Sequence, residues 1–182
     1  MTADALTADA LTVVAADAHR SHDPPYELNM GEVVRPVWER TARAEAIRAA
    51  LAGAGHPVAP PTLHGLAPIL AVHDPALVEF LETGWAAWRA AGGPPTLIPD
   101  TFVLPRLALG RARATRSPLG APGAFCFDTA TPMVHGTWAA VVAAADLALS
   151  AADLVAAGAR SAYALCRPPP RFRRYGRVRL PA

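Results

Sequence analysis

The side chains best suited to chemistry lie in the segment "HRSHDPP", which carries His19, His22 and Asp23 within a few residues of each other. Imidazole and carboxylate groups bind metal ions or transfer protons. The segment follows a short apolar run at 12–16, and open α/β sheets place their sites at the carboxyl ends of strands. A polar turn has the same composition and is the simpler interpretation.

The remaining histidines and cysteines do not form a metal-binding pattern. His56, His64 and His135 have no histidine or acid at helical spacing. Cys126 and Cys166 are too few for a disulfide framework, so reduced thiols are expected. A catalytic zinc needs three protein ligands and an open position. We therefore predict no catalytic residue and no metal ligand in this chain.

Two other catalytic motifs are absent from the sequence. The stretch "GAPGAF" supplies Gly120 and Gly123, but it neither follows a clear strand nor opens a helix, as a dinucleotide-binding loop would. No serine stands in a G-x-S-x-G elbow. The pattern indicates neither a nucleotide-binding enzyme nor a serine hydrolase of that kind.

Basic charge is concentrated at the end of the chain. Residues 167–182 hold six arginines, four prolines and no acid, whereas residues 1–166 hold 11 arginines against 15 acids, and there is no lysine. The stretch "RFRRYGRVRL" interleaves arginine with Phe172 and Tyr175, a composition typical of single-stranded nucleic-acid binding. A solvated tail and a non-native reading frame are the simpler interpretations.

The elements that must position these groups alternate in type. A β-branched run at 12–16 predicts a buried strand, and prolines confine a second strand, at 56–62, to a sheet edge. Asp74 as N-cap, Pro75 at the first position and an apolar stripe predict a helix that ends at two glycines. The full predicted order is strand 12–16, helix 37–54, strand 56–62, helix 75–91, helix 136–157 and strand 161–166.

This alternation predicts an α/β fold with a parallel sheet. The strand "SAYALC" is apolar throughout, as a strand buried on both faces would be. Residues 93–135 hold many prolines without a sustained period, and a loop this long in a compact domain usually carries function or is disordered. The opening residues 1–11 are expected to be a flexible lead-in.

Composition places the chain among globular proteins. Its 182 residues are 52% hydrophobic and 18% charged, which suits one domain with a real core. The longest apolar run, "WAAVVAAA", stops at Asp146, so we predict no transmembrane helix. No basic residue precedes Arg20, so we expect no signal peptide and a cytoplasmic location.

Four collinear blocks resemble a known family. "HDPPYELNMGEVVRPVWERTARAEAI", "LHGLAPILAVHDPALVEFLETGWAAW", "GAFCFDTATPMVHGTWAAVVAAADLAL" and "GARSAYALCRPP" are similar to the N-terminal half of the zinc-dependent acetylpolyamine amidohydrolases, which belong with the histone deacetylases. The resemblance implies an incomplete arginase/deacetylase-type α/β fold, the edge of a parallel sheet with flanking helices. It divides the chain into the lead-in 1–11, a deacetylase-like part 12–169 and an arginine-rich tail 170–182.

The resemblance also implies a reaction and its loss. Family members use zinc to hydrolyse the acetyl amides of acetylated polyamines or acetyl-lysine, and their "CRPP" continues as "GHHA" with two catalytic histidines. Here Pro170, Arg171 and Phe172 stand at those positions. We therefore expect a truncated relative that is inactive alone, and a shifted reading frame would explain its ending. The alternative is a non-enzymatic protein that associates with another copy or a full-length relative, or that binds acidic or nucleic-acid partners through the tail.

The same resemblance places the rim of the family's substrate pocket in two loops. Its residues here are Glu27, Leu28 and Gly31 in the first loop and Phe127, Asp128 and Thr131 in the second. Acidic groups at this rim would suit a cationic acetylpolyamine. The other interpretation is that these are turn and capping residues. Asn29 and Met30 differ from the family's choices, which leaves the substrate preference open.

Overall fold

The structure is a computed structural model that describes residues 11–103, 115, 117–126 and 128–168. The predicted lead-in, apart from its last residue, and the arginine-rich tail lie outside these residues. The predicted rim residue Phe127 does too.

A three-stranded parallel sheet forms the centre of the fold. Its order is β4 (Val58–Ala59), β1 (Thr12–Val14), β5 (Ala162–Ala164), with Val13 of β1 opposite Val58 on one side and Tyr163 on the other. β1 and β5 pair although they come from the two ends of the described chain, because the parallel arrangement needs long crossovers. The α/β class and the edge position of the proline-limited strand are confirmed.

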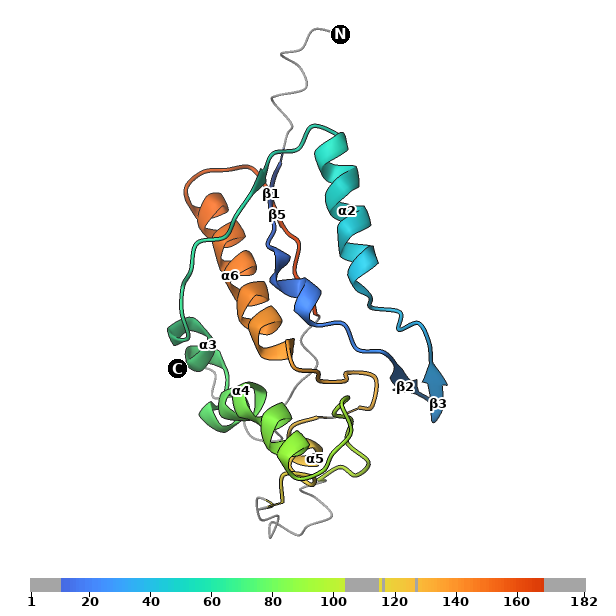
Figure 1. The fold of residues 1–182 in the computed structure, drawn as a ribbon. Helices are drawn as coiled ribbons and strands as arrows, with labels where there is room; N and C mark the ends of the chain where they lie inside the picture. The colour runs from blue at the N-terminus through green and yellow to red at the C-terminus, as the bar shows by residue number, and fades with distance from the viewer. Residues whose placement is uncertain (1–10, 104–114, 116, 127, 169–182) are drawn as a thin grey trace, which may run out of the picture.

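Helices cover both faces of the sheet (Figure 1). Alternate residues of a strand point to opposite faces. Val13 therefore packs toward Ile47 and Leu51 of α2 (Thr41–Gly53), whereas Val14 packs toward Leu147 of α6 (Thr137–Ala156). The result is a layered arrangement of α2, sheet and α6.

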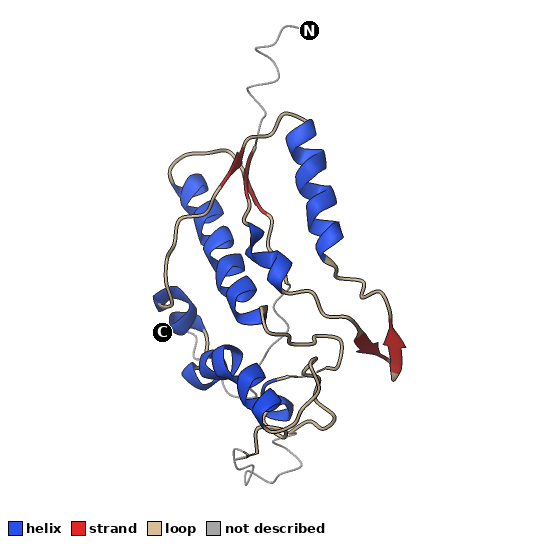
Figure 2. Ribbon diagram, in the orientation of Figure 1, coloured by secondary structure: helices blue, strands red, loops and turns tan. Residues whose placement is uncertain are grey.

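A second core lies at the lower end of the molecule in Figure 2, under α4 (Pro75–Ala90). The predicted cap is present, because Asp74 Oδ1 accepts the N–H of Ala76 at 2.9 Å. The helix packs near α3 (Ala67–Val72) and α5 (Pro122–Phe125), and an isolated bridge joins Leu97 to Met133. The buried members of this core are Leu77, Phe80, Leu81, Trp88, Leu97, Cys126 and Met133.

Two short elements connect the sheet to the side of the molecule. The 3-10 helix η1 (Asp17–Ser21) follows β1, and a hairpin follows it, formed by β2 (Glu27–Asn29) and β3 (Glu32–Val34). The hairpin turns at Met30 and Gly31, whose φ angles are 52° and 84°. Neither element was predicted from the sequence.

Two boundaries differ from the sequence-based expectations. The helix predicted from Val37 begins at Thr41, after a bend in which Val37 is nevertheless buried. β5 is not buried on both faces, because Tyr163 is 39% exposed. Within the described residues β5 pairs only with β1, so no neighbour shields this part of the strand.

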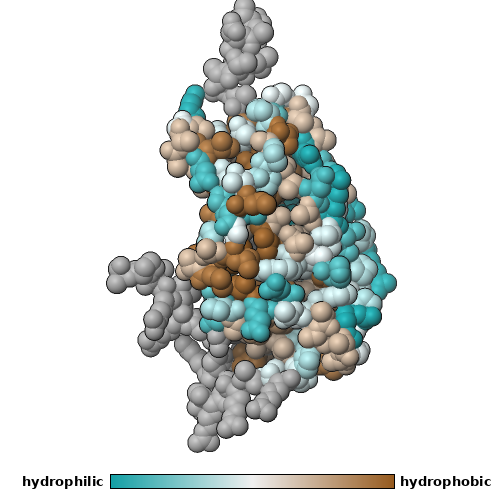
Figure 3. All heavy atoms as spheres, turned by 60° about the vertical axis from the view of Figure 1, so that its left-hand side comes forward, coloured by the Kyte–Doolittle hydropathy of each residue, from teal (hydrophilic) through white to brown (hydrophobic). Residues whose placement is uncertain are grey.

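Helix α6 is long and apolar enough to cross a membrane by length and composition alone, which the count of consecutive apolar residues did not reveal. Two of its polar side chains, however, accept backbone hydrogen bonds from the segment after β4. Asp146 Oδ1 accepts the N–H of His64 and Ser150 Oγ accepts that of Thr62. Figure 3 turns this side of the molecule forward and shows hydrophobic residues gathered in the middle of the face. The helix thus packs on the sheet through Leu147 and Ala151 and holds the segment after β4 through polar side chains.

Candidate functional site

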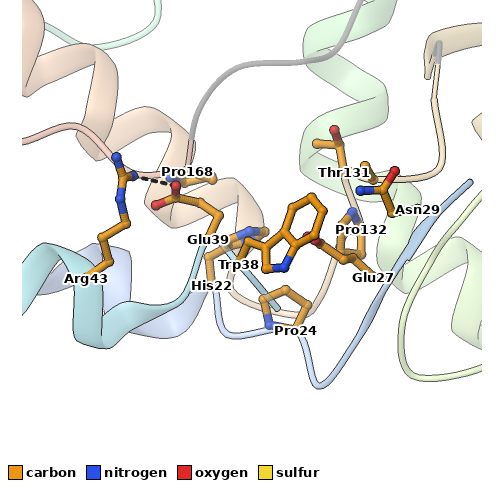
Figure 4. Close-up of a pocket in the computed structure, with 11 residues that line it drawn as sticks. His22, Pro24, Glu27, Asn29, Trp38, Glu39, Arg43, Thr131, Pro132 and Pro168 are labelled. Carbon is orange, nitrogen blue, oxygen red and sulfur yellow. Dashed lines mark hydrogen bonds and ion pairs between the residues drawn. The ribbon is translucent and has the colours of Figure 1, made fainter. Parts of the chain in front are cut away.

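A pocket of about 360 Å³ lies beyond the carboxyl ends of β1 and β5 (Figure 4). Its walls come from the loop after β1, the hairpin, the bend before α2, the loop before α6 and the residue after Arg167. Parallel sheets commonly place their binding sites at this end. The lining residues are His22, Pro24, Glu27, Asn29, Trp38, Glu39, Arg43, Ala130, Thr131, Pro132 and Pro168.

Arg167 holds two of these walls together from behind. Its side chain is 2% exposed, and its Nη1 donates to the carbonyl oxygens of His19 (2.8 Å) and His22 (2.5 Å). Its Nη2 donates to the carbonyl oxygen of Glu39 at 2.6 Å. Burial lowers the pKa of Arg167 from its usual value, and the carboxylates of Glu39 and Asp23 act in the opposite direction.

His22 is kept neutral in the pocket wall. Burial, and next the positive charge of Arg167, lower the pKa of His22 to about 4, against an opposing effect of Asp23. Its Nδ1 lies 2.9 Å from Thr137 Oγ1, which also accepts the N–H of Val134 at 2.8 Å. Thr137 Oγ1 therefore links the His22 ring to the backbone before α6.

The two carboxylates of the pocket differ in their partners. The negative charge of Glu39 is balanced by two arginines, because its Oε2 accepts from Arg43 Nη1 at 2.6 Å and its Oε1 lies 3.6 Å from Arg167 Nε. Glu27 is 6% exposed, and its carboxylate has no hydrogen bond or ion pair with any residue that the structure describes. Trp38, 68% exposed, lines the same pocket (Figure 4).

This arrangement suits an organic cation. A carboxylate that is largely removed from water and unpaired binds a cationic donor more strongly than an exposed one does. An indole ring adds a cation–π contribution. The described part of the chain contains no group of three or more His, Cys, Asp or Glu side chains that could hold a metal ion, so the family's zinc does not fit these residues.

The candidate ligands of "HRSHDPP" are used separately. His19 Nδ1 donates to the carbonyl of Ala16 at 2.8 Å, His22 contacts Thr137, and Asp23 Oδ1 accepts from Thr41 Oγ1 at 3.1 Å. The three side chains therefore do not converge on one point. The polar-turn interpretation fits this geometry.

The predicted rim residues are distributed between pocket and turns. Glu27 and Thr131 line the pocket, while Gly31 forms the hairpin turn. Asp128 Oδ1 accepts from Ala130 N and from Thr131 Oγ1, which is a capping role. The Leu28 carbonyl accepts from the hydroxyl of Thr129. Sequence reasoning named His22 only as a candidate metal or proton-transfer group, and it missed Trp38 and Arg167. The one signal for Arg167 was an arginine directly after an apolar strand.

Comparisons with known proteins show what the chain is similar to. No model of a protein family matches the chain. An acetylpolyamine amidohydrolase of Mycoplana ramosa is 38% identical over 160 residues, which are 87% of this chain and 46% of that protein. Acetylpolyamine amidohydrolase 1 of Pseudomonas aeruginosa is 38% identical over 158 residues, 86% of this chain and 45% of that protein. The chain is a homologue of the N-terminal part of acetylpolyamine amidohydrolases.

A solved acetylpolyamine aminohydrolase structure from Burkholderia pseudomallei supports the relationship in three dimensions. It superposes with a TM-score of 0.78 at 33% identity, over 88% of this chain and 45% of that chain. The chain thus spans just under half the length of the amidohydrolases it matches. The predicted partial arginase/deacetylase-type fold is confirmed.

Proposed function

We propose that this chain forms one wall of the substrate pocket of an amidohydrolase for acetylated amines, and that Glu27 recognises the cationic end of the substrate. The relatives' names supply the reaction class. The observation that carries the proposal is the Glu27 carboxylate, which belongs to a residue only 6% exposed, lines the pocket together with Trp38 and has no ion-pair partner among the described residues. An ammonium group would donate to Glu27 and contact the indole face.

Hydrolysis requires groups beyond this wall. In the family, zinc would supply the activation of water, and the described residues provide no set of ligands for it. Outside them the only carboxylates are Asp4 and Asp9, and there is no histidine or cysteine. We propose that the chain binds the amine end of the substrate but does not turn it over by itself.

A calorimetric titration of the 182-residue chain with N-acetylputrescine tests the binding role. The charge of Glu27 is expected to carry the affinity, so Glu27→Gln should weaken binding about tenfold or more. Glu32→Gln, an exposed carboxylate on the paired strand of the same hairpin, is the matched control and should bind as the parent does. Equal affinity of the Glu27→Gln variant and the parent would refute the proposal.

A second function, association with another polypeptide, is favoured by the edge of β5. Leu165 donates its N–H to Val14, so in a parallel ladder Ala162 and Ala164 direct their backbone groups to the opposite edge, where the Ala164 carbonyl accepts the N–H of Cys166. An open edge is a template for strand pairing. We infer that a strand of a longer relative pairs there, since the chain spans just under half of its relatives.

Co-purification with the full-length Pseudomonas relative tests this association. Ala162→Pro removes one outward N–H of β5, because proline has no amide hydrogen. Capture of the relative by the parent chain and loss of capture by the variant would support pairing at this edge. Equal capture by both chains would place the contact elsewhere, and no capture by either would refute the association.

A further inference from the structure

We propose that Arg167 is the positioning residue of the pocket: its guanidinium gathers the carbonyl oxygens of His19, His22 and Glu39 and fixes the two wall segments that carry them. The inference does not depend on which ligand the pocket takes.

The contacts join two wall segments that otherwise meet through side-chain pairs such as Thr41–Asp23 and Arg20–Glu45. His19 and His22 belong to the end of η1 and its following turn, and Glu39 belongs to the bend before α2. Arg167 enters from the far end of the chain, two positions beyond the buried Leu165. Three carbonyl oxygens from two segments thus accept from one planar, rigid group, which a flexible ammonium could not replace.

Burial makes these bonds decisive. A guanidinium that is 2% exposed cannot exchange its carbonyl partners for water. The side-chain charges around it are Glu39 and Asp23, which attract it, with Arg43 paired to Glu39 at 2.6 Å. Losing the guanidinium would leave the carbonyl oxygens of His22 and Glu39 without this donor, while that of His19 would keep the N–H of His22. The link between the two walls would weaken.

The geometry also assigns Arg167 a role through His22. The cation lies against the His22 backbone, while the ring bonds to Thr137. Arg167 disfavours protonation of this ring and Asp23 favours it. The other charged side chains in the wall of the same pocket are Glu27, Glu39 and Arg43. Burial and, next to it, the charge of Arg167 therefore keep His22 a neutral hydrogen-bonding group in this wall.

Three variants of the complete chain separate geometry from charge. Arg167→Met removes both, Arg167→Lys keeps the charge without the fork, and Arg89→Met is the control, because Arg89 Nη1 also donates to a carbonyl, that of Gly93 at 2.7 Å, away from the pocket. Hydrogen exchange of peptides covering 17–24 and 37–43 reports the walls. Both Arg167 variants should speed that exchange about tenfold or more, with α4 unchanged.

The second readout is the midpoint of the His22 titration, which NMR of the ring measures. A purely structural role of Arg167 would not shift this midpoint selectively. The midpoint should rise toward 6.5 in Arg167→Met, stay low in Arg167→Lys, and stay unchanged in Arg89→Met. Parent-like exchange in Arg167→Lys would show that the fork is not needed. Equal loss of protection across α4 and α6 would show that Arg167 has a general core role. An unchanged His22 midpoint in Arg167→Met would show that the charge of Arg167 has no effect on the ring. Each of these results overturns the proposal.

Discussion

The backbone N–H of His64 donates to Asp146 Oδ1 at 2.8 Å, although 82 positions separate the two residues. The imidazole Nε2 of His64 lies 2.8 Å from Asp153 Oδ2, about two turns after Asp146 on the same face of α6. Together with the Thr62–Ser150 bond, these contacts hold the segment after β4 on the outer side of α6. The segment thus follows the helix through polar contacts.

The ion pair at His64 predicts a pH-dependent contribution to stability. The hydrogen bond to Asp153 is the main cause that raises the pKa of His64. A raised folded-state pKa stabilises the protein below the unfolded value of about 6.5, and the contribution is lost as pH rises through the folded pKa. Urea unfolding should show His64→Gln more destabilising at pH 6 than at pH 9. His73→Gln, at an exposed position, should show no such difference; a larger loss at pH 9 would contradict the assignment.

His22 predicts the opposite slope. Its folded-state pKa of about 4 lies below the unfolded value, so the unfolded chain binds the proton first as the solution is acidified. Stability should fall as pH falls from about 6.5 toward 4, by about 3 kcal/mol in the limit. His22→Asn, which keeps a hydrogen-bonding side chain but does not titrate, should remove this part of the slope. An unchanged slope would show that His22 is not the group responsible.

Close packing at the start of α6 predicts a sensitive glycine. A Cβ at Gly136 would lie 2.2 Å from the carbonyl oxygen of Ser21, which is backbone and cannot rotate away. Gly136→Ala should therefore destabilise the fold by about 2 kcal/mol. Gly53→Ala is the matched control, because a Cβ there meets nothing within 4 Å and alanine favours the helix. Equal thermal midpoints for both variants would contradict the predicted clash.

The N-cap of α4 predicts a moderate effect. Asp74→Ala removes the acceptor for Ala76 N and should cost about 1 kcal/mol of unfolding free energy. Asp74→Ser keeps a capping oxygen and should recover most of that loss. Denaturant midpoints of the two variants measure the difference, and an alanine variant as stable as serine would show that the cap contributes nothing.

The complete chain is predicted to release no acetate from N-acetylputrescine, with or without added zinc. The described residues offer no metal-binding group, and Asp4 and Asp9 alone cannot complete one. An enzymatic acetate assay measures this outcome. Turnover above the zinc-only background, abolished by a chelator, would refute it.

The sequence predicted what local pattern controls. Helix α4 carries a cap, a proline at its first position and a glycine stop, and β1 and β4 lie between turn residues, so each was predicted close to its place. The hairpin was missed because Met30 stands at a positive φ, where a hairpin signal would show asparagine or glycine. Arg167 was missed because its partners are 128 to 148 positions away.

The order of synthesis gives those separations a further meaning. The walls carrying His22 and Glu39 leave the ribosome early, whereas the guanidinium that ties them arrives only after α6 and β5 have been made. A nascent chain therefore holds both sides of the cavity long before its fastening. The cavity therefore closes only after Arg167, which lies 128 positions beyond Glu39, has been made.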